Sequence, residues 1–320
     1  MLIKSYVTTR TINLKNKKYT FLLKLVFGLA LIFFIGWKIQ SSEALGKLSS
    51  LSLTNNAILY FSLFIILIPI NWGLETLKWR MLLSDSNQIS FVKSFKLVLA
   101  GITTGIMTPN RLGNFVGRAY DKDIKDRENA IVATFLSNIS QFMATILIGL
   151  VALYLLPQHL NSEVNKTLIY AIAGILQLLS FVVFIIPNNA FVNFFTGKFL
   201  PKYQKKIDEL AELPLGKKLM IFLIAIFRYI VIVIQFYLVL KVFIEGLNTD
   251  IWVGIALTFL LTTLIPSVAF GKLFVREASA ILILSLFFIP VEIILSCTFI
   301  LWCFNLALPA LLGMRFLYKK

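Results

Sequence analysis

The chain has 320 residues, of which 58% are hydrophobic and 14% are charged. Soluble globular proteins carry about 25% charged residues, so this composition excludes that class. The 31 Lys and Arg residues outnumber the 15 Asp and Glu residues, and the formal net charge is +16. Because the basic residues lie between long apolar segments, the positive-inside rule explains the excess without a nucleic-acid partner. We predict an all-α, polytopic transmembrane helix bundle with about seven to nine membrane segments.

The N-terminal segment 1–19 is polar and basic, and we expect it in the cytoplasm of a bacterium, with the multi-pass chain in the inner membrane. The apolar segment 20–38 is long enough to remain as the first span rather than a cleaved signal. A second span is predicted at 56–77, and it ends in a cluster of charged and aromatic residues. The simplest interpretation of Glu75 and Arg80 is an ion pair at the membrane interface.

The next apolar segment, 91–109, contains Gly101 and Gly105 and ends at Pro109. If it crossed the membrane, the basic residues after it and the basic segment 188–218 would lie outside. A re-entrant segment keeps both inside, and irregular backbone is tolerated at membrane depth where it faces protein or water. We therefore predict that this segment enters the membrane and returns to the same side.

All of these segments belong to one predicted transmembrane domain, 20–315, followed by a short basic tail, 316–320. If every later span crosses, the C-terminus lies in the cytoplasm, and one further re-entrant segment would place it outside. The sequence leaves both arrangements open. The later predicted spans are 129–156, 166–187, 219–244, 251–266, 274–289 and 291–314.

Arg228 stands near the middle of the 219–244 span, roughly 15 Å along the helix from Lys218. A guanidinium at that depth costs at least ~2.5–3.5 kcal/mol and stays charged, so it needs an anionic partner or a water-filled cavity. Three interpretations remain: an ion pair between helices, a site for an anionic ligand such as a lipid phosphate, or misplaced helix ends. Gln235 lies almost two turns further along and shares the face of Arg228.

Two segments of the chain resemble each other, 103–118 and 262–276. Each runs from a Thr-Thr pair through a Pro to a Gly, with an Arg five residues after that Gly. The likeness arises either by chance in a chain rich in Leu, Ile and Phe or from two repeat halves, about 56–156 and 219–314. In transporters, repeats with Gly- and Pro-broken segments at matching positions indicate a binding site near the bilayer midplane.

The repeat would bring Arg118 and Arg276 to a common cavity from opposite halves. Arg111 and Arg118 have the chemistry to hold a phosphate, because a guanidinium binds it with two parallel hydrogen bonds. Marking the membrane boundary is the alternative role for these two residues. For Arg276 and Glu277 the alternatives are an ion pair with another helix, a ligand contact or an exposed interfacial position.

Three short motifs carry a family resemblance: Glu-x-x-x-Trp-Arg at 75–80, Pro-x-Arg-Leu-Gly within 109–118, and Pro to Arg-Glu at 266–277. In this order they resemble the lysylphosphatidylglycerol synthase transmembrane region, also called the flippase-like membrane family, over roughly residues 20–315. The chain departs from the family pattern at Asn114, where a carboxylate is usual. The resemblance therefore implies no role for a negative charge at this position.

In the full-length synthases of that family, a soluble domain that transfers an aminoacyl group follows the membrane region. We expect that domain to be absent, so the resemblance implies lipid handling rather than the synthase reaction. The expected function is binding an anionic membrane lipid or lipid-linked substrate and moving it between leaflets. The alternatives are a membrane-embedded lipid-modifying enzyme and a non-catalytic partner of an envelope-biosynthesis enzyme.

The sequence shows no constellation of catalytic acids, bases or nucleophiles, so we expect no enzyme activity, no cofactor and no bound metal. The protein partners that we keep open are a second copy of the chain and an envelope-biosynthesis protein. The predicted substrate-binding residues are Arg228, Arg118, Arg276, Glu277, Arg111, Gln235, Glu75 and Arg80.

Overall fold

The computed structural model describes residues 54–106, 108, 111–156, 203–265 and 271–317, and the single positions 33, 167, 170, 171, 174 and 175. Every regular element of this part of the chain is a helix, which confirms the all-α prediction. The predicted N-terminal segment 1–19 lies outside the described residues. So do the predicted span 20–38 apart from position 33, most of the predicted span 166–187, and residues 188–202 of the basic segment 188–218.

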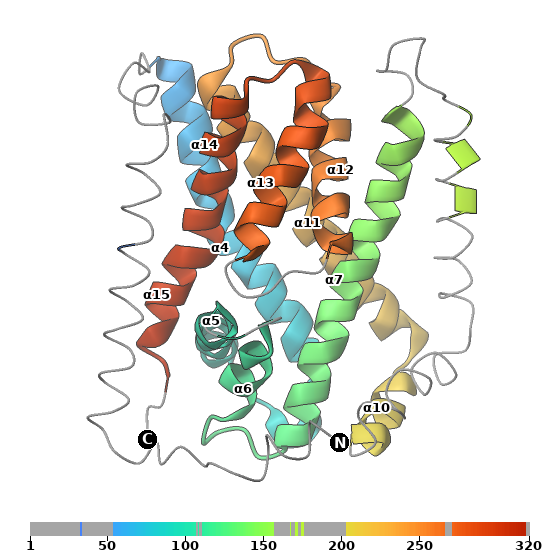
Figure 1. Cartoon of the computed structure of the whole chain (residues 1–320). Coiled ribbons are helices and arrows are strands. Elements are labelled where there is room, and N and C mark those ends of the chain that lie inside the picture. The colour runs from blue at the N-terminus through green and yellow to red at the C-terminus, as the bar shows by residue number, and fades with distance from the viewer. Residues whose placement is uncertain are drawn as a thin grey trace.

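Figure 1 shows the helices and their labels. The α-helices are α4 (Asn55–Met81), α5 (Phe91–Ile106), α6 (Gly113–Ala119), α7 (Arg127–Leu155), α10 (Gln204–Ala211), α11 (Leu215–Phe243), α12 (Ile251–Leu264), α13 (Gly271–Leu284), α14 (Val291–Trp302) and α15 (Leu308–Met314). The short elements are the 3-10 helices η1 (Asp85–Asn87) and η5 (Ser285–Phe287) and the π-helix η6 (Cys303–Ala307).

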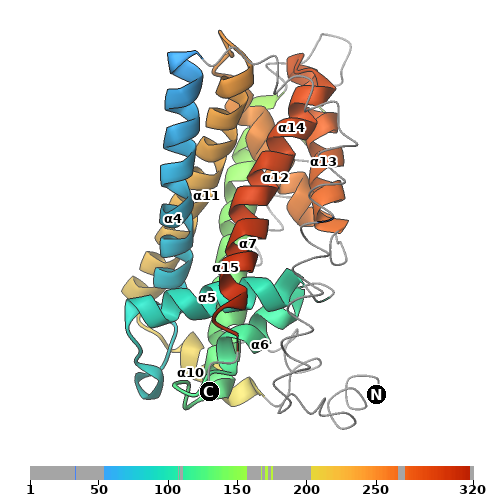
Figure 2. The same cartoon turned by 90° about the vertical axis from the view of Figure 1, so that its left-hand side faces the viewer.

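Within the described ranges, four helices are long and apolar enough to cross a membrane: α4, α7, α11 and the continuous helix Val291–Met314 formed by α14, η6 and α15. Figures 1 and 2 show α4 and the last helix running in one direction and α7 and α11 in the other. The predicted spans 56–77, 129–156, 219–244 and 291–314 thus correspond to these four helices. Together they form the walls of the bundle.

The ends of these helices follow local sequence rules. The Thr54 hydroxyl caps α4 by accepting from the backbone N–H of Ala57 at 3.2 Å, and the Asp126 carboxylate caps α7 by accepting from that of Asn129 at 2.9 Å. Pro214 immediately precedes α11, where a missing N–H costs nothing. The apolar runs therefore become helices with defined first turns.

Helices α5 and α6 form a hairpin at the lower end of the bundle. Figure 2 shows α5 lying across the long helices, and both ends of the hairpin connect at this lower end. The two helices approach closely at glycines: a Cβ at Gly117 would lie 2.7 Å from the Ala100 carbonyl oxygen, and Thr104 donates to the Gly113 carbonyl at 2.6 Å. This arrangement agrees with the predicted re-entrant segment 91–109.

Helices α12 and α13 form a second hairpin, and its ends connect at the opposite end of the bundle (Figure 1). Each helix has 14 residues, roughly 21 Å of helix, whereas crossing the hydrocarbon core takes about 30 Å. Counting 251–266 and 274–289 as two separate crossings is therefore wrong. Because the α12–α13 pair enters and returns on the same side, an even or odd number of crossings stays even or odd. The last helix therefore still ends at the lower end.

Each hairpin packs against a helix from the other half of the chain. Helix α5 packs against α15 from the second half, and α12 packs against α7 from the first half, while α4 and α11 lie side by side between them. A glycine stands at each crossed contact. Gly313 of α15 meets the backbone of Leu99, and a Cβ at Gly149 of α7 would lie 2.6 Å from the Leu260 Cβ.

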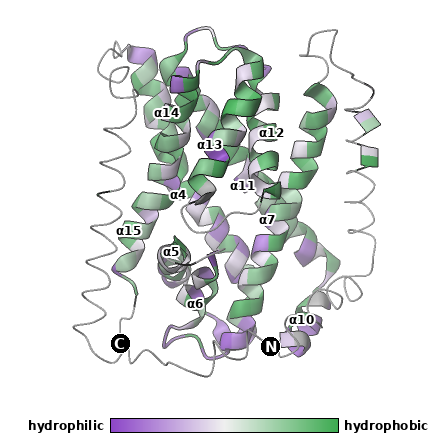
Figure 3. Cartoon of the chain, in the orientation of Figure 1, coloured by the Kyte–Doolittle hydropathy of each residue, from purple (hydrophilic) through white to green (hydrophobic). Residues whose placement is uncertain are grey.

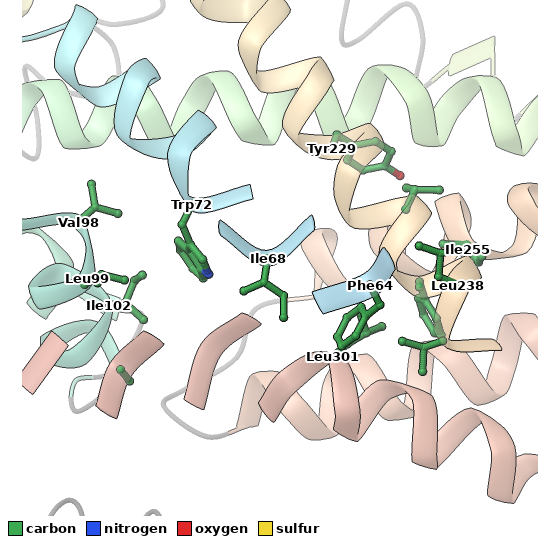
Figure 4. Close-up of a cluster of buried hydrophobic side chains, with 14 of the residues drawn as sticks. Phe64, Ile68, Trp72, Val98, Leu99, Ile102, Tyr229, Leu238, Ile255 and Leu301 are labelled. Carbon is green, nitrogen blue, oxygen red and sulfur yellow. The ribbon is translucent and has the colours of Figure 1, made fainter. Parts of the chain in front are cut away.

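The apolar interior is built largely from the inward faces of α4, α5, α11 and the last helix (Figure 4). Phe64 and Trp72 of α4 lie on its buried face, and Ile102 of α5 and Leu301 of α14 belong to the same cluster. Apolar side chains on the outer faces of the long helices are exposed, as expected for surfaces in contact with lipid. Figure 3 shows hydrophilic segments gathered at the lower end.

Candidate anion-binding site

One carboxylate, Glu75 of α4, is shared by three cations inside the bundle. Its Oε1 lies 3.0 Å from Nη2 of Arg118 on α6. Its Oε2 lies 3.0 Å from Nζ of Lys78, one turn further along α4, and 3.4 Å from Nη1 of Arg228 on α11. Glu75, Lys78 and Arg118 are buried. The anionic partner that Arg228 requires is therefore present, but that partner also serves two other positive charges.

Helical spacing on α4 places aromatic rings beside these cations. Trp72, Glu75 and Trp79 stand three and four residues apart and share one helix face. The Trp79 ring lies 5.6 Å from the Arg118 guanidinium carbon, and the Trp72 ring lies 5.8 Å from that of Arg228. Because a ring face attracts a cation, each tryptophan stabilises its arginine without neutralising it.

Helix α7 supplies neutral hydrogen-bonding groups to the same cluster. The Gln141 side-chain oxygen accepts from Arg228 Nη1 at 2.9 Å and from Lys78 Nζ at 3.3 Å, while its amide nitrogen donates to the Ala225 carbonyl at 3.2 Å. The Ser137 hydroxyl donates to Glu75 Oε1 at 3.3 Å. Gln141 thereby fixes the positions of two cations and leaves their charge unchanged.

Asn114, the departure from the family pattern, contacts Arg118. Its Oδ1 accepts from Arg118 Nε at 2.9 Å. An amide can support the guanidinium in this geometry, but it contributes no negative charge. The absence of a carboxylate at this position therefore raises the net positive charge of the site.

A cavity of about 320 Å³ lies beside the shared carboxylate. It is far larger than the ~10–15 Å³ that one water molecule needs. Its polar wall combines Glu75 with the guanidinium groups of Arg111, Arg118 and Arg228, and α5 contributes its small residues. The full lining consists of Trp72, Glu75, Gly101, Ile102, Gly105, Arg111, Asn114, Phe115, Arg118, Asn138, Gln141, Phe142, Thr145, Arg228, Thr263 and Leu306.

A second cavity of about 210 Å³ adjoins the first. Arg111 and Arg228 line both cavities, so they stand at the junction, whereas Arg118 lines only the first and Arg276 only the second. The prediction that Arg118 and Arg276 face one common cavity is therefore wrong. The second lining consists of Asn71, Trp72, Arg111, Arg228, Ile232, Phe259, Thr262, Thr263, Leu273, Arg276, Leu301, Trp302, Asn305 and Leu306.

Arg111 differs from the other cations because its side chain makes no hydrogen bond or ion pair with any described residue, while its backbone N–H donates to the Thr108 carbonyl at 3.2 Å. Its side chain retains accessible surface, and its backbone has φ of 56°, a left-handed conformation that is uncommon for a residue with a side chain. Such outliers persist where the surrounding structure requires them and are frequent at binding sites. Arg111 is thus a free cation held at the junction of two cavities.

Positive charge exceeds negative charge across the two cavities and their walls. Lys78, Arg111, Arg118, Arg228 and Arg276 face the carboxylates of Glu75 and, next to Arg276 in sequence, Glu277. Arg276 donates to the Thr298 carbonyl at 2.8 Å. Three buried guanidinium nitrogens have no hydrogen-bond partner among the described residues: Nη1 of Arg118, Nε of Arg228 and Nε of Arg276. These donors suit a ligand rich in acceptor oxygens.

The other predicted site residues have different surroundings. Arg80 is exposed and donates to the Ile89 carbonyl at 3.1 Å, so the predicted interfacial pair of Glu75 and Arg80 is wrong. Glu75 lies too deep, on the opposite face from that contact. Gln235 is fully buried on α11 but lines neither cavity. Glu277 is buried on α13 beside Arg276.

Sequence reasoning missed Lys78, Asn71 and Asn305 as site residues. The signal for Lys78 was its spacing, because a Lys three residues after a Glu on a helix lies within reach of the carboxylate. The signal for Asn71 was its position, because it is a polar residue within an apolar run, next to Trp72. Asn305 gave no signal, since its orientation depends on the π-helix η6 within the last span.

The comparison with known families agrees with this architecture. Residues 21–313 match the family described as the Lysylphosphatidylglycerol synthase TM region. The chain therefore belongs to this family of integral membrane proteins, which is tied to lipid handling. No curated protein and no solved structure matches the sequence.

Proposed function

We propose that the protein binds the phosphate-bearing headgroup of an anionic lipid, or of a lipid-linked substrate, and moves it between the leaflets. The single observation that carries this proposal is the sharing of Glu75 by Lys78, Arg118 and Arg228 beside a cavity of about 320 Å³. One carboxylate compensates three cations incompletely. A phosphate in the cavity would supply the missing negative charge.

The free energy of the site favours such an exchange. Burying an unpaired charge is expensive, so cations that lack full compensation gain more from a new anion than surface arginines do. Arg228 is best placed to bind it, because its contact with Glu75 is the longest of the three and its Nε is unpartnered. Phosphate oxygens accept two parallel hydrogen bonds from a guanidinium.

The acyl chains need not enter the bundle. The outer faces of α4 and α11 expose Ile66, Leu223 and Phe227, which are suited to lipid tails. The headgroup would leave water at one end of the bundle and meet fixed positive charge within it, so that its desolvation is offset locally. The tails would remain in the hydrocarbon throughout.

We infer that the lower end of the bundle in Figure 1 is cytoplasmic, in the inner membrane of a bacterium. Basic residues concentrate there, in the loop before α7 and around α10, while the loop after α11 carries Glu245 and Asp250. Cytoplasmic loops of membrane proteins are enriched in Lys and Arg. The cavity beside Glu75 would then receive headgroups from the cytoplasmic leaflet.

Purified protein in liposomes tests the proposal. Phosphatidylglycerol labelled on an acyl chain is placed in the inner leaflet, and its appearance outside is followed by quenching of the exposed label. We expect wild-type protein and Arg80→Ala to move the lipid and Arg228→Ala to move at most about a tenth as much. Arg228→Ala should insert normally, because it removes a costly buried charge.

The same assay separates the alternatives. Chemical alteration of the lipid would indicate a lipid-modifying enzyme. If the lipid is neither moved nor chemically altered, the result would favour a non-catalytic partner of another envelope protein. Wild-type transport by Arg228→Ala would exclude the central role given to this arginine.

A further inference from the structure

The second cavity carries chemistry that a phosphate alone does not use. We propose that it binds an uncharged, hydroxyl-bearing part of the headgroup, such as a glycerol, another polyol or a sugar attached to the phosphate. This inference rests on the proposed function, because it places the phosphate at the junction of the two cavities, next to Arg111 and Arg228. The group beyond the phosphate would then enter the second cavity.

Two amides in this cavity form a matched donor and acceptor. Asn71 Nδ2 donates to Asn305 Oδ1 at 2.9 Å, which leaves Asn71 Oδ1 and Asn305 Nδ2 without a partner among the described residues. Exchanging oxygen and nitrogen in both amides gives the same result, one free acceptor and one free donor. A hydroxyl group both donates and accepts, so it satisfies the pair, whereas an ammonium group only donates.

The fold holds this amide pair inside the bundle. Asn71 is 1% exposed, and both residues line the cavity. The π-helix η6 places Asn305 within the last membrane helix, and single-turn π-helices are frequent at functional sites. A buried amide that lacks a hydrogen bond lowers the stability of the fold. A ligand that supplies the missing hydrogen bonds would offset this loss.

The charge of the cavity excludes a cationic headgroup. Arg111, Arg228 and Arg276 line it, and no carboxylate does among the described residues. An ammonium group would be repelled at short range in a medium of low dielectric. Phosphatidylethanolamine, which carries an ammonium, is therefore an unfavourable ligand for this site. A neutral polyol meets no such repulsion.

Lipid binding to the purified, detergent-solubilised protein tests the inference. Dissociation constants are measured for phosphatidylglycerol, for phosphatidylethanol, a phosphodiester of the same charge that lacks the hydroxyl groups, and for phosphatidylethanolamine. For wild-type protein we expect phosphatidylglycerol to bind about tenfold more tightly than phosphatidylethanol, because two additional hydrogen bonds form. Phosphatidylethanolamine should bind more weakly than both.

Variants assign that preference to the amide pair. Asn71→Leu should reduce the affinity for phosphatidylglycerol to that for phosphatidylethanol and leave the latter unchanged. Gln235→Leu is the matched control, since it removes a buried amide that lines neither cavity. Asn305→Ala provides a second variant, less buried, in case Asn71→Leu does not fold.

Several outcomes would overturn the inference. These are equal affinities of wild-type protein for phosphatidylglycerol and phosphatidylethanol, an equal loss for both lipids in Asn71→Leu, or preferred binding of phosphatidylethanolamine. Failure of the proposed function looks different, because Arg228→Gln would then leave the affinity for phosphatidylethanol unchanged. Soluble glycerol phosphate completes the set: binding as tight as phosphatidylglycerol would keep the hydroxyl site but exclude a lipid as its ligand.

Discussion

Glu75 carries the charge balance of the site, because it is the carboxylate that contacts Lys78, Arg118 and Arg228. It stands on the inward face of α4 between two tryptophans that support the arginines. Removing its charge would leave several buried cations without a counter-charge. The cost of breaking a buried ion pair in this way is larger than that of losing a pair at the surface.

We therefore predict that Glu75→Gln lowers the free energy of unfolding by about 3–5 kcal/mol, although the amide keeps the shape of the side chain. Thermal unfolding in detergent measures the effect. Glu245→Gln is the control, since Glu245 is exposed in the loop after α11. Added anionic lipid should restore more of the lost melting temperature in Glu75→Gln than in the control. Equal melting temperatures for the two variants would refute the assigned role.

The sequence predicted that Arg228 needs a counter-charge or a cavity, but not which residue provides the counter-charge. The depth of the guanidinium required an anion or a cavity, and both are present. The partner was missed because Glu75 looked like the end of a span, whereas α4 continues to Met81 and keeps the carboxylate within the bundle. Its assignment to Arg80 was wrong because the two side chains point away from each other. Contacts between distant helices leave no local trace in a sequence.

Among the elements, α5 and α15 form the closest crossed contact. Gly313 lies against the backbone of Leu99, and the Thr103 hydroxyl donates to the Ala310 carbonyl at 2.7 Å. Small residues permit such an approach between helices in a membrane, where packing rather than the hydrophobic effect drives association. The contact holds the α5–α6 hairpin, and with it Arg118, beside Glu75.

Gly313→Leu should therefore separate α5 from α15 and move Arg118 away from Glu75. We expect a loss of stability of at least about 1–3 kcal/mol from overpacking, together with weaker lipid binding. Gly216→Leu is the matched control, since nothing lies within 4 Å of a Cβ at that position. Melting temperatures and dissociation constants of the two variants provide the test. A Gly313→Leu protein as stable as the control would contradict the packing that we describe.

Helix α10 is tied to the start of α7 outside the membrane-spanning segments. Lys206 Nζ lies 3.0 Å from Asp126 Oδ2. Partial burial by itself would raise the pKa of Asp126, but hydrogen bonds from the Asn129 backbone and from Lys206 lower it overall. A carboxyl group with a lowered pKa stabilises the folded state above its ordinary pKa of about 3.9 and loses that contribution as the pH falls further.

We predict that Asp126→Asn, which preserves a helix cap, loses under about 1 kcal/mol of stability at neutral pH. The melting temperatures of wild type and variant should converge as the pH is lowered through the depressed pKa of Asp126. Melting curves at neutral pH and near pH 3 measure this convergence. A constant difference between the two proteins would show that the charge of Asp126 is not responsible.

The long helices were predictable because an apolar segment of sufficient length has few alternatives in a membrane. Both α7 and α11 coincide with predicted spans to within a few residues at most ends. The hairpin of α12 and α13 was harder to predict, since each apolar run is nearly long enough to read as a crossing. The short lengths of the two helices and their packing against each other show that the pair turns back.

For the whole molecule we propose that the two similar segments, 103–118 and 262–276, belong to two halves of the chain with inverted orientation. The hairpin of each half packs against the last helix of the other, and the first long helices, α4 and α11, run antiparallel along each other (Figures 1 and 2). Inverted repeats place binding sites at the interface between halves. Glu75 and Arg228 meet at that interface, one from each half.

In the function that we propose, an excess of cations in these cavities binds an anionic headgroup, and Arg111 offers the most direct test. Among the described residues its side chain has no hydrogen-bond or ion-pair partner, so replacing it removes a charge from both cavities without leaving a neighbour unpaired. Both replacements, Arg111→Gln and Arg111→Lys, keep a Cβ, so the conformational cost of the φ of 56° stays the same. Arg80→Gln is the control outside the cavities.

The decisive measurement is the dissociation constant of each purified variant for phosphatidylglycerol. We predict a value about tenfold higher for Arg111→Gln than for wild type, a smaller rise for Arg111→Lys, and none for Arg80→Gln, with all melting temperatures unchanged. If Arg111→Gln instead binds phosphatidylglycerol as tightly as wild type does, the cavity cations do not hold an anionic headgroup.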